Sequence, residues 1–339
     1  LCAQNPHIVP SAEPRESPTA TTVPAVSIVI PCHNAGPWLA EQLEALARQR
    51  FDRPWEIVLV DNRSTDDSLS VARRYADRFP AFRIIAADEG RSPAYARNVG
   101  VRAAQGEIIL FCDADDVVAD NWLATMAGLV EKHRFVACRL EQERLNPPET
   151  VSSRHFVQDH ELIHHPFYDH AGAGTIGVRR TDFLKAGGFD ERLKTHEDLE
   201  FCWRMQLDGF TLHFTEETWI HYRYRAHATA AFRQQVRYGR DYITVYRMYR
   251  SLGHEIPMKR LRGYVREFLA CFLHGIRNLH DKQARLSWIN DAGFHLGMIL
   301  GLLGRPLHPA FPVGHHLAAD GEAPPPATRE NDTPTPTEA

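Results

Sequence analysis

Two aspartates separated by one residue, Asp113 and Asp115, are the part of this 339-residue sequence best suited to chemistry. They follow an apolar run over residues 107–111, which predicts a short buried β-strand. Side chains two positions apart on an extended backbone point the same way, so both carboxylates can share one cation. Mg²⁺ and Mn²⁺ favour oxygen ligands, commonly one or two carboxylates together with phosphate oxygens of a substrate. The alternative for such a short motif is a strand that ends in an acidic turn.

A second pair of acids, Glu197 and Asp198, begins a predicted helix over residues 197–207. The unpaired backbone N–H groups of a helix N-terminus favour carboxylates at this position. A carboxylate held in this way can accept a proton from a reacting hydroxyl. The alternative is that both acids only stabilise the start of the helix.

Four short apolar runs must position these acids. The runs cover residues 26–30, 56–60, 82–86 and 107–111, and helical patterns follow near residues 38–46, 69–75 and 94–104. Strands that alternate with helices, each strand a nearly continuous apolar run, predict an α/β fold whose mostly parallel central sheet is flanked by helices. Ligands of such sheets bind beyond the carboxyl ends of the strands. Polar residues stand at these ends, namely Asn34, Asp61, Asn62 and the acids of residues 113–116.

The other segments give the domain organisation. Residues 25–225 are predicted to form the α/β domain, in two halves over about 25–138 and 171–225, and apolar residues at helical spacing predict a helical extension over 226–305. Residues 1–24 and 306–339 are rich in Pro, Ala, Thr, Ser and Glu, and are expected to be disordered tails. Between the two halves, residues 141–170 are polar and predict a mobile loop. Its five histidines, at positions 155, 160, 164, 165 and 170, are expected to bind no metal.

Composition limits the cellular setting. The six cysteines form no close pairs, which fits a reducing cytosol. No run reaches the roughly 18 apolar residues of a spanning helix, and residues 1–11 lack the pattern of a secretion signal. The chain starts at Leu1, which leaves open whether an N-terminal piece is missing.

Basic residues gather late in the chain. Residues 223–267 hold eleven Lys or Arg against three acids, although the net charge of the whole chain is −4. Arg223, Arg225, Arg233 and Arg237 could neutralise phosphate, or could form a solvated helical face. Basic and apolar residues over 233–303 predict helices that contact a membrane surface, the alternatives being packing against the α/β domain or a dimer contact. No nucleic-acid partner is expected.

Several motifs together resemble one enzyme family. They are Val26–Asn34, Val60–Ser68, Ala96–Gly100, Asp113–Asp116, Gly187–Glu191 and His196–Glu200. In this order and spacing, over roughly residues 26–225, the sequence resembles the family-2 glycosyltransferases, an inverting group with a GT-A-type fold. Each motif alone would be weak, whereas the joint match is specific.

The resemblance implies transfer of a sugar from a UDP- or GDP-linked donor to a glycan or lipid-linked acceptor in cell-envelope synthesis. It implies Mn²⁺ or Mg²⁺ bound mainly by Asp115, with Asp113 on ribose or metal. His221 would lie near the metal and the diphosphate as a further metal ligand, although a lone histidine is often structural. Asp198, beside Glu197, would be the general base. The donor side would comprise Pro31, Asn34, Asp61, Asn62, Arg97, Asn98 and Asp113. Asp61 could instead cap the following helix, and Arg97 and Asn98 could support the loop without touching the donor. The expected location is cytoplasmic, with peripheral contact at the inner face of the plasma membrane.

Two other functions are compatible with such a fold. A sugar-phosphate nucleotidyltransferase would carry a Gly-rich basic loop after the first strand, where this chain has Pro31–Asn34. A non-catalytic carbohydrate-binding or scaffold module would be expected to have lost one of the carboxylates. Processive synthases of the family usually carry Gln-x-x-Arg-Trp, and Gln234–Tyr238 ends in Tyr instead, so addition of a single sugar is expected.

Overall fold

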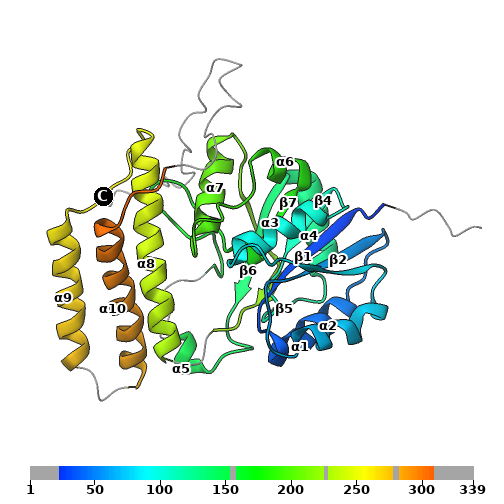
Figure 1. Cartoon of the computed structure of the whole chain (residues 1–339), viewed down its shortest axis with the longest axis horizontal. Coiled ribbons are helices and arrows are strands. Elements are labelled where there is room, and N and C mark those ends of the chain that lie inside the picture. The colour runs from blue at the N-terminus through cyan, green and yellow to red at the C-terminus, as the bar shows by residue number, and fades with distance from the viewer. Residues whose placement is uncertain (1–22, 153–157, 225–227, 278–281, 309–339) are drawn as a thin grey trace, which may run out of the picture.

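The computed structural model describes residues 23–152, 158–224, 228–277 and 282–308, and one eight-stranded sheet forms its centre (Figure 1). The strands are β1 (Val26–Cys32), β2 (Trp55–Asp61), β3 (Phe82–Ala86), β4 (Ile108–Phe111), β5 (Val117–Val118), β6 (Phe135–Glu141), β7 (Ile176–Arg179) and β8 (His213–His221). They lie in the order β3-β2-β1-β4-β7-β6-β8-β5. Among these strands, β5 and β7 alone run against the others, so the predicted mostly parallel sheet is confirmed.

Each face of the sheet is covered by its own helices, because successive side chains of a strand point to opposite faces. On β1, Ile28 and Ile30 pack with α1 (Gly36–Ala47), α2 (Ser68–Tyr75) and α4 (Trp122–His133). Val29, between them, packs on the other face with α3 (Pro93–Ala103), α6 (Arg180–Lys185) and α7 (Glu197–Leu207). The result is a three-layer α/β domain in which α3 and α7 share the face of the sheet that bears Val29.

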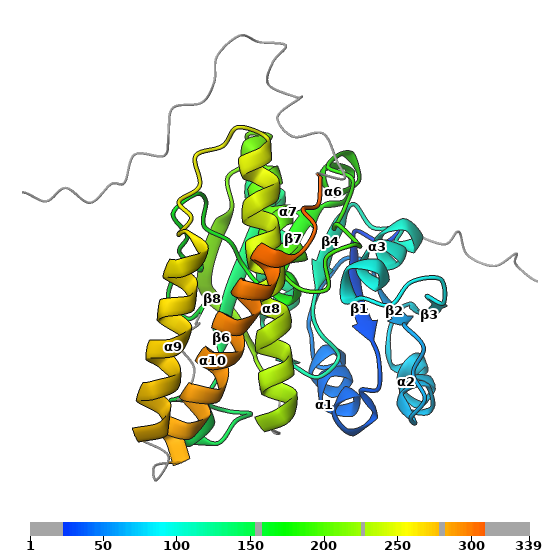
Figure 2. The ribbon, with the colours of Figure 1, turned by 60° about the vertical axis from the view of Figure 1, so that its left-hand side comes forward.

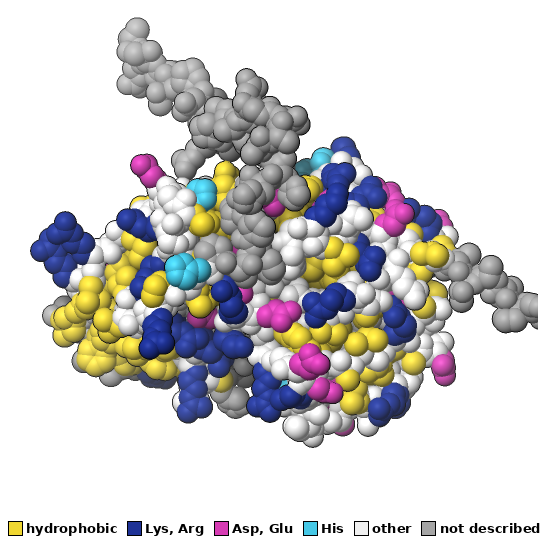
Figure 3. Space-filling view, turned by 45° about the horizontal axis from the view of Figure 1, so that its top comes forward, with side chains coloured by type: hydrophobic (Ala, Val, Ile, Leu, Met, Phe, Trp, Pro, Cys, Tyr) yellow, Lys and Arg dark blue, Asp and Glu magenta, His cyan; other side chains and the backbone are white. Residues whose placement is uncertain are grey.

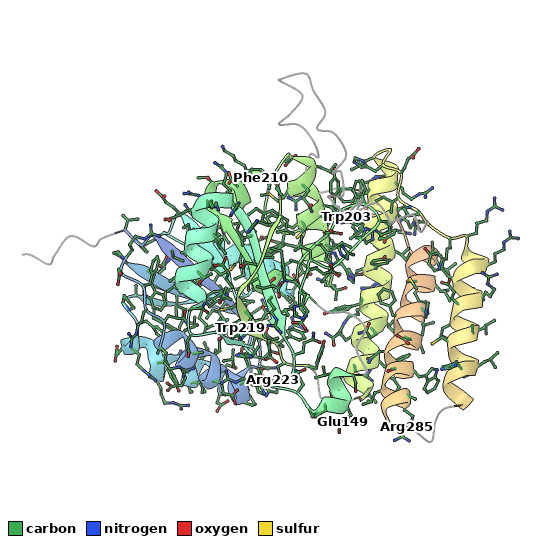
Figure 4. The ribbon with its side chains drawn as sticks, turned by 180° about the vertical axis from the view of Figure 1, so that it is seen from behind. Glu149, Trp203, Phe210, Trp219, Arg223 and Arg285 are labelled. Atoms are coloured by element: carbon green, nitrogen blue, oxygen red, sulfur yellow. The ribbon has the colours of Figure 1, made fainter. Side chains whose placement is uncertain are left out.

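The helical extension consists of α8 (Ala228–Ser251), α9 (Leu261–Arg277) and α10 (Lys282–Leu303). Figures 1 and 2 show α8 next to the α/β domain, with α9 on the outside. The backbones of α8 and α10 touch at glycines, since a Cβ on Gly239 would lie 2.0 Å from the Phe294 carbonyl oxygen. Trp203 of α7 contacts the rings of Tyr246 and Tyr249 at centroid distances of 5.7 and 5.3 Å (Figure 4). The extension therefore shares a core with the α/β domain.

Residues 141–170 are more ordered than a mobile loop, so that prediction is wrong for the part of the segment described. A short helix, α5 (Pro148–Val151), follows β6. Gln158 is buried and donates to the Cys138 carbonyl and to Thr175 Oγ1, at 2.7 and 2.8 Å. His170 is buried as well. A polar sequence concealed this packing, because a buried glutamine whose hydrogen bonds are satisfied leaves no hydrophobic pattern.

Several predictions concern residues outside the described ranges. These include His155, Arg225, and almost all of the two predicted tails. Within the described ranges, none of the helices combines the length and the apolar content that crossing a bilayer requires.

Candidate active site

The carboxyl ends of β1 and β2 meet at one edge of the sheet, where their loops are joined by hydrogen bonds. Pro31 lies opposite Val60 in the parallel register, and the next carbonyl, of Cys32, accepts from the Asn62 backbone N–H at 2.8 Å. Asn34 has a left-handed backbone (φ 53°), and its side-chain oxygen accepts from the Thr65 N–H at 2.8 Å. The predicted donor residues of these two loops are therefore neighbours.

Asp61 and Asn62 lie at or just after the end of β2 and are both buried. Their side chains form hydrogen bonds with nearby backbone groups. Asp61 Oδ1 accepts from the Ser64 N–H at 3.2 Å and so stabilises the turn after β2. The following helix, α2, has Asp67 at its N-cap, so Asp61 does not cap it. The Asn62 amide donates to the carbonyls of Ala87 and Gly90, at 2.6 and 2.9 Å. Asn62 thus fixes the loop after β3, and contact of either residue with a donor nucleotide stays a prediction.

Arg97 links the two acidic segments of the chain. Its guanidinium is buried and donates to Asp113 Oδ1 at 2.6 Å and to Glu197 Oε1 at 3.0 Å. Burial would lower the pKa of Arg97, but the two carboxylates raise it, so the group stays charged. Burial and the neighbouring Asp198 raise the pKa of Glu197, while Arg97 acts in the opposite direction. The geometry therefore brings the first half of the domain and the second half to one site.

A second connection confirms that Asp113 and Asp198 are close. The Ala173 N–H donates to Asp198 Oδ2 at 3.2 Å. A Cβ on the next residue, Gly174, would lie 2.9 Å from Asp113 Oδ2. The dipeptide Ala173–Gly174 lies between the two carboxylates, and glycine at position 174 leaves the space that Asp113 occupies.

The acidic loop after β4 is held from both sides. Gln42, fully buried in α1, donates to the Asp113 carbonyl at 3.0 Å and accepts from the Val118 N–H at 3.1 Å. On the other side, the Arg223 side chain donates to the Asp115 carbonyl at 2.9 Å (Figure 4). These bonds fix the backbone that carries Asp113 and Asp115.

Negative charge is crowded in this loop. Burial raises the pKa of Asp116 well above its ordinary range, and the charges of Asp115 and Asp113 raise it further. A divalent cation beside these acids would relieve the repulsion, so the residues present fit a metal ion. Across the described ranges, however, no three His, Cys, Asp or Glu side chains form a ready-made metal centre. A cation here would take its remaining ligands from a substrate's phosphates and from water.

His221 lies beside the acidic loop, but both of its ring nitrogens are engaged. It pairs with Val117 of β5, its Nδ1 contacts Glu141 Oε2, and its Nε2 accepts from the Trp219 indole N–H at 3.1 Å. A metal bound at Nε2 would have to displace that N–H group. The role of His221 as a metal ligand stays a prediction.

Asn98 is anchored to the Gly-Gly-Phe-Asp-Glu segment. Its amide nitrogen donates to the Phe189 carbonyl and to Glu191 Oε1, both at 2.9 Å, and its oxygen accepts from the Phe189 N–H at 2.9 Å. These bonds join the Ala96–Gly100 motif to the Gly187–Glu191 motif in the folded chain. They support the loop-supporting alternative for Asn98.

Three residues of the site, Gln42, Glu141 and Asp241, are not evident from the sequence. Gln42 interrupts the apolar side of a helix, and a polar residue at a position that the pattern predicts to be buried indicates a structural or functional role. Glu141 and Asp241 left no such signal, because each contacts a residue far from it in the sequence, His221 and Thr195 respectively.

The sequence profile of glycosyl transferase family 2 matches residues 27–184. Within these residues, which make up a little under half of the chain, the sequence is similar to this family. The match runs from β1 into α6, so it includes Asp113 and Asp115 and ends before Glu197.

Curated relatives match over parts of their length. Poly(ribitol-phosphate) beta-N-acetylglucosaminyltransferase TarS of Staphylococcus aureus is 26% identical over 189 residues, which are 54% of this chain and 32% of TarS. Validoxylamine A glucosyltransferase of Streptomyces hygroscopicus subsp. limoneus is 28% identical over 256 residues, covering 65% of this chain and 56% of that protein. The chain thus spans about a third of one relative and just over half of the other.

Solved structures share the fold. The mannosyltransferase PcManGT from Pyrobaculum calidifontis, in complex with GDP-Man and Mn²⁺, superposes with a TM-score of 0.58 at 18% identity, covering 83% of this chain and 88% of that one. At this identity the likeness establishes the fold alone, which is the predicted GT-A-like α/β architecture with a helical region after it.

Proposed function

We propose that this chain is a family-2 glycosyltransferase. It transfers a sugar from a nucleotide-diphosphate sugar to an acceptor hydroxyl, with inversion at the anomeric carbon and with Mn²⁺ or Mg²⁺. The proposal depends on one observation, the Arg97 guanidinium that joins Asp113 to Glu197. The reaction needs a charge-stabilising centre for the leaving diphosphate and a base for the acceptor, close together. Arg97 and the Ala173–Gly174 dipeptide hold two acidic groups in that relation.

The donor side uses the joined loops after β1, β2 and β4. Asp61 and Asn62 line the place for the base and ribose, with Pro31 and Asn34 beside them, and Asp113 faces ribose or metal. Asn98 acts indirectly, by fixing the loop at Phe189. Arg97 holds Asp113 in place and balances its charge. The donor could be UDP- or GDP-linked, since the relatives and structural neighbours include an N-acetylglucosaminyltransferase and a GDP-mannose complex.

Asp115 is the proposed main metal ligand, and Asp113 is the second. His221 is a third ligand, whose Nε2 exchanges the Trp219 N–H for the metal. A bound dication stabilises the negative charge that grows on the departing diphosphate. The chain itself contributes a rigid loop, because Gln42 and Arg223 fix the backbone on both sides of Asp115. The PcManGT complex contains Mn²⁺, which supports a metal in a protein of the same fold.

Asp198 is the proposed general base. Its two oxygens accept from the N–H groups of Ala173 and Leu199, at 3.2 and 2.8 Å, which fixes the orientation of the carboxylate. Glu197 is buried and bound to Arg97, so it suits a positioning role better than proton transfer. The base activates the acceptor hydroxyl on the side opposite the leaving diphosphate, so the attack inverts the anomeric carbon.

The cellular location and the acceptor are proposed from the names of relatives and from the cysteines. Names of relatives refer to poly(ribitol-phosphate) and to minor teichoic acid biosynthesis, which favours a glycan or lipid-linked acceptor of the cell envelope. Cys32, Cys112, Cys138, Cys202 and Cys271 are all free thiols, which favours a cytoplasmic location, and we place the protein peripherally at the inner face of the plasma membrane. A nucleotidyltransferase is disfavoured by the loop at Pro31–Asn34, and a non-catalytic module by the retained carboxylates.

A panel of UDP- and GDP-sugars, scored by nucleotide release with and without Mn²⁺, tests the proposal. Asp198→Asn is expected to lower kcat on the order of a hundredfold or more while donor binding is kept. Asp115→Asn is expected to raise the Mn²⁺ concentration needed for half-maximal rate. Asp120→Asn, whose side chain is 82% exposed, is the matched control and should behave as the wild type. Metal-independent turnover, or full activity of both Asp198→Asn and Asp115→Asn, would contradict the proposed roles of these two residues.

A further inference from the structure

One face of α9 is solvent-exposed and combines basic with apolar side chains. We define the α9 face as Arg262, Arg266, Leu269, Phe272 and Leu273, all of which are exposed. The exposed fractions of Leu269, Phe272 and Leu273 are 52%, 41% and 59%. Figures 1 and 2 show α9 as the outermost helix, packed beside α10 on its inner side. Large apolar side chains so exposed on one helix mark an interaction surface.

The sequence spacing puts the charges and the apolar groups on one stripe. Arg262, Arg266, Leu269 and Leu273 are separated by four, three and four residues, the spacing of a single helix face. Figure 3 shows yellow side chains gathered over the end of the molecule that α9 and α10 occupy, with Lys and Arg beside them. The α9 face is thus basic toward the start of the helix and apolar toward its end.

Two partners could cover this face, a second copy of the chain or an anionic bilayer, and charge distinguishes between them. The one acid within α9 is Glu267, and it pairs with Lys259. The α9 face therefore has no carboxylate that could pair with the arginines of a second copy of the chain. A second copy docked through the same face would offer arginines and leucines but no acid. An anionic bilayer offers phosphate groups for the arginines and acyl chains for Leu269, Phe272 and Leu273.

We propose that the α9 face docks on an anionic lipid bilayer, with α9 lying along the surface. Three apolar side chains and two arginines give reversible binding, which salt weakens because exposed charges are screened. This orientation would turn α8 and the α/β domain away from the lipid, since both lie on the other side of α10 (Figure 1). The proposal rests on the peripheral membrane location proposed above and names the helix face that makes the contact. It does not require sugar transfer.

Co-sedimentation of the full chain with vesicles, without donor or metal, tests the proposal. The wild type is expected to bind vesicles of phosphatidylcholine mixed with phosphatidylglycerol, and to bind pure phosphatidylcholine much less. Replacing Arg262 and Arg266 together by Gln should weaken binding on the order of twenty-five-fold, at about fivefold per arginine. The double variant Leu269→Ser with Leu273→Ser should also weaken binding, at low and high salt alike.

Matched controls lie at the other end of the molecule. Arg73→Gln with Arg74→Gln changes two exposed arginines of α2, and Leu184→Ser changes a leucine of α6 that is 42% exposed. Both should bind vesicles as the wild type does, and circular dichroism should show all variants folded.

Equal binding by the α9 variants, or no binding by the wild type at low salt, would overturn the proposal. So would a wild-type dimer in light scattering that the leucine variant converts to a monomer without any change in vesicle binding. Failure here leaves the sugar-transfer proposal standing, because donor turnover is measured separately.

Discussion

The carboxylate of Asp241 accepts hydrogen bonds from the backbone N–H and the hydroxyl of Thr195, at 3.1 and 3.2 Å. The same buried oxygen accepts from the Lys194 N–H at 3.1 Å. Asp241 belongs to α8, outside the residues that match the family, and Thr195 lies two residues before Glu197. His196, between them, has a left-handed φ of 59°, which is uncommon for a residue other than glycine. The helical extension therefore fixes the backbone that presents the proposed base.

Asp241→Ala should uncouple this backbone from α8. Two N–H groups and a hydroxyl lose their acceptor, which should lower the free energy of unfolding by about 1–3 kcal/mol. Displacement of Asp198 should lower kcat on the order of tenfold to a hundredfold, with the KM for the donor little changed. Asp241→Asn keeps one acceptor oxygen and should recover much of the kcat. Steady-state kinetics check this, and a raised donor KM at normal kcat would contradict it.

Arg97 allows a second prediction, about buried charge. Arg97→Leu leaves Asp113 and Glu197 without their shared partner, and should lower the free energy of unfolding by about 3–5 kcal/mol. Arg97→Lys should fail to restore activity, since one ammonium group lacks the fork that reaches both carboxylates. Urea unfolding gives the stability. Arg48→Leu breaks the exposed pair with Asp120 and should cost at most about 1 kcal/mol. Equal losses for the two leucine variants would show that the Arg97 bridge is no stronger than a surface pair.

Sequence periodicity predicted the elements that position the site. The strand over residues 82–86 and the helix over 197–207 match β3 and α7 residue for residue, and β1, β2 and β4 differ only at their ends. Nearly continuous apolar runs are informative because a strand buried on both faces leaves few alternatives. The edge where Asp61 and Asp113 lie follows from the parallel order of those strands.

The partners of the polar side chains could not be predicted in the same way. Asn98 bonds to Phe189, and Asp241 to Thr195, across long stretches of sequence, so no local pattern contains either pair. His221 Nδ1 reaches Glu141 only once β6 and β8 pair, whereas its Nε2 contact with Trp219 lies within β8 itself. Hydrogen bonds of this kind are decided by the packed fold.

A third prediction concerns acid stability. Burial lowers the pKa of His170 from its ordinary 6.5 to about 3. Because the folded-state pKa is depressed, the unfolded chain binds the proton first, so the stability from neutral His170 is complete above pH 6.5 and is lost as the pH falls toward 3. Between pH 7 and pH 5 this loss should be about 2 kcal/mol.

His170→Gln should flatten that slope, because glutamine does not titrate. Urea unfolding of both proteins at several pH values measures it. His160→Gln changes a histidine whose side chain is 69% exposed and should leave the slope from His170 in place. A slope that is identical in wild type and His170→Gln would show that this histidine is not the source of acid sensitivity.

Gly174 and Gly128 provide a matched pair of glycine-to-alanine changes. A Cβ at Gly174 would lie 2.9 Å from Asp113 Oδ2, whereas a Cβ at Gly128, in α4, meets nothing within 4 Å. Gly128→Ala should leave activity unchanged and stabilise the helix by about 1 kcal/mol. Gly174→Ala should push the Asp113 carboxylate aside and lower kcat/KM on the order of tenfold or more, with only a small change in Tm. Since both variants add the same methyl group, a loss of activity at position 174 alone would locate the effect at Asp113. Unchanged kinetics for Gly174→Ala would mean that the position of this carboxylate does not limit the reaction.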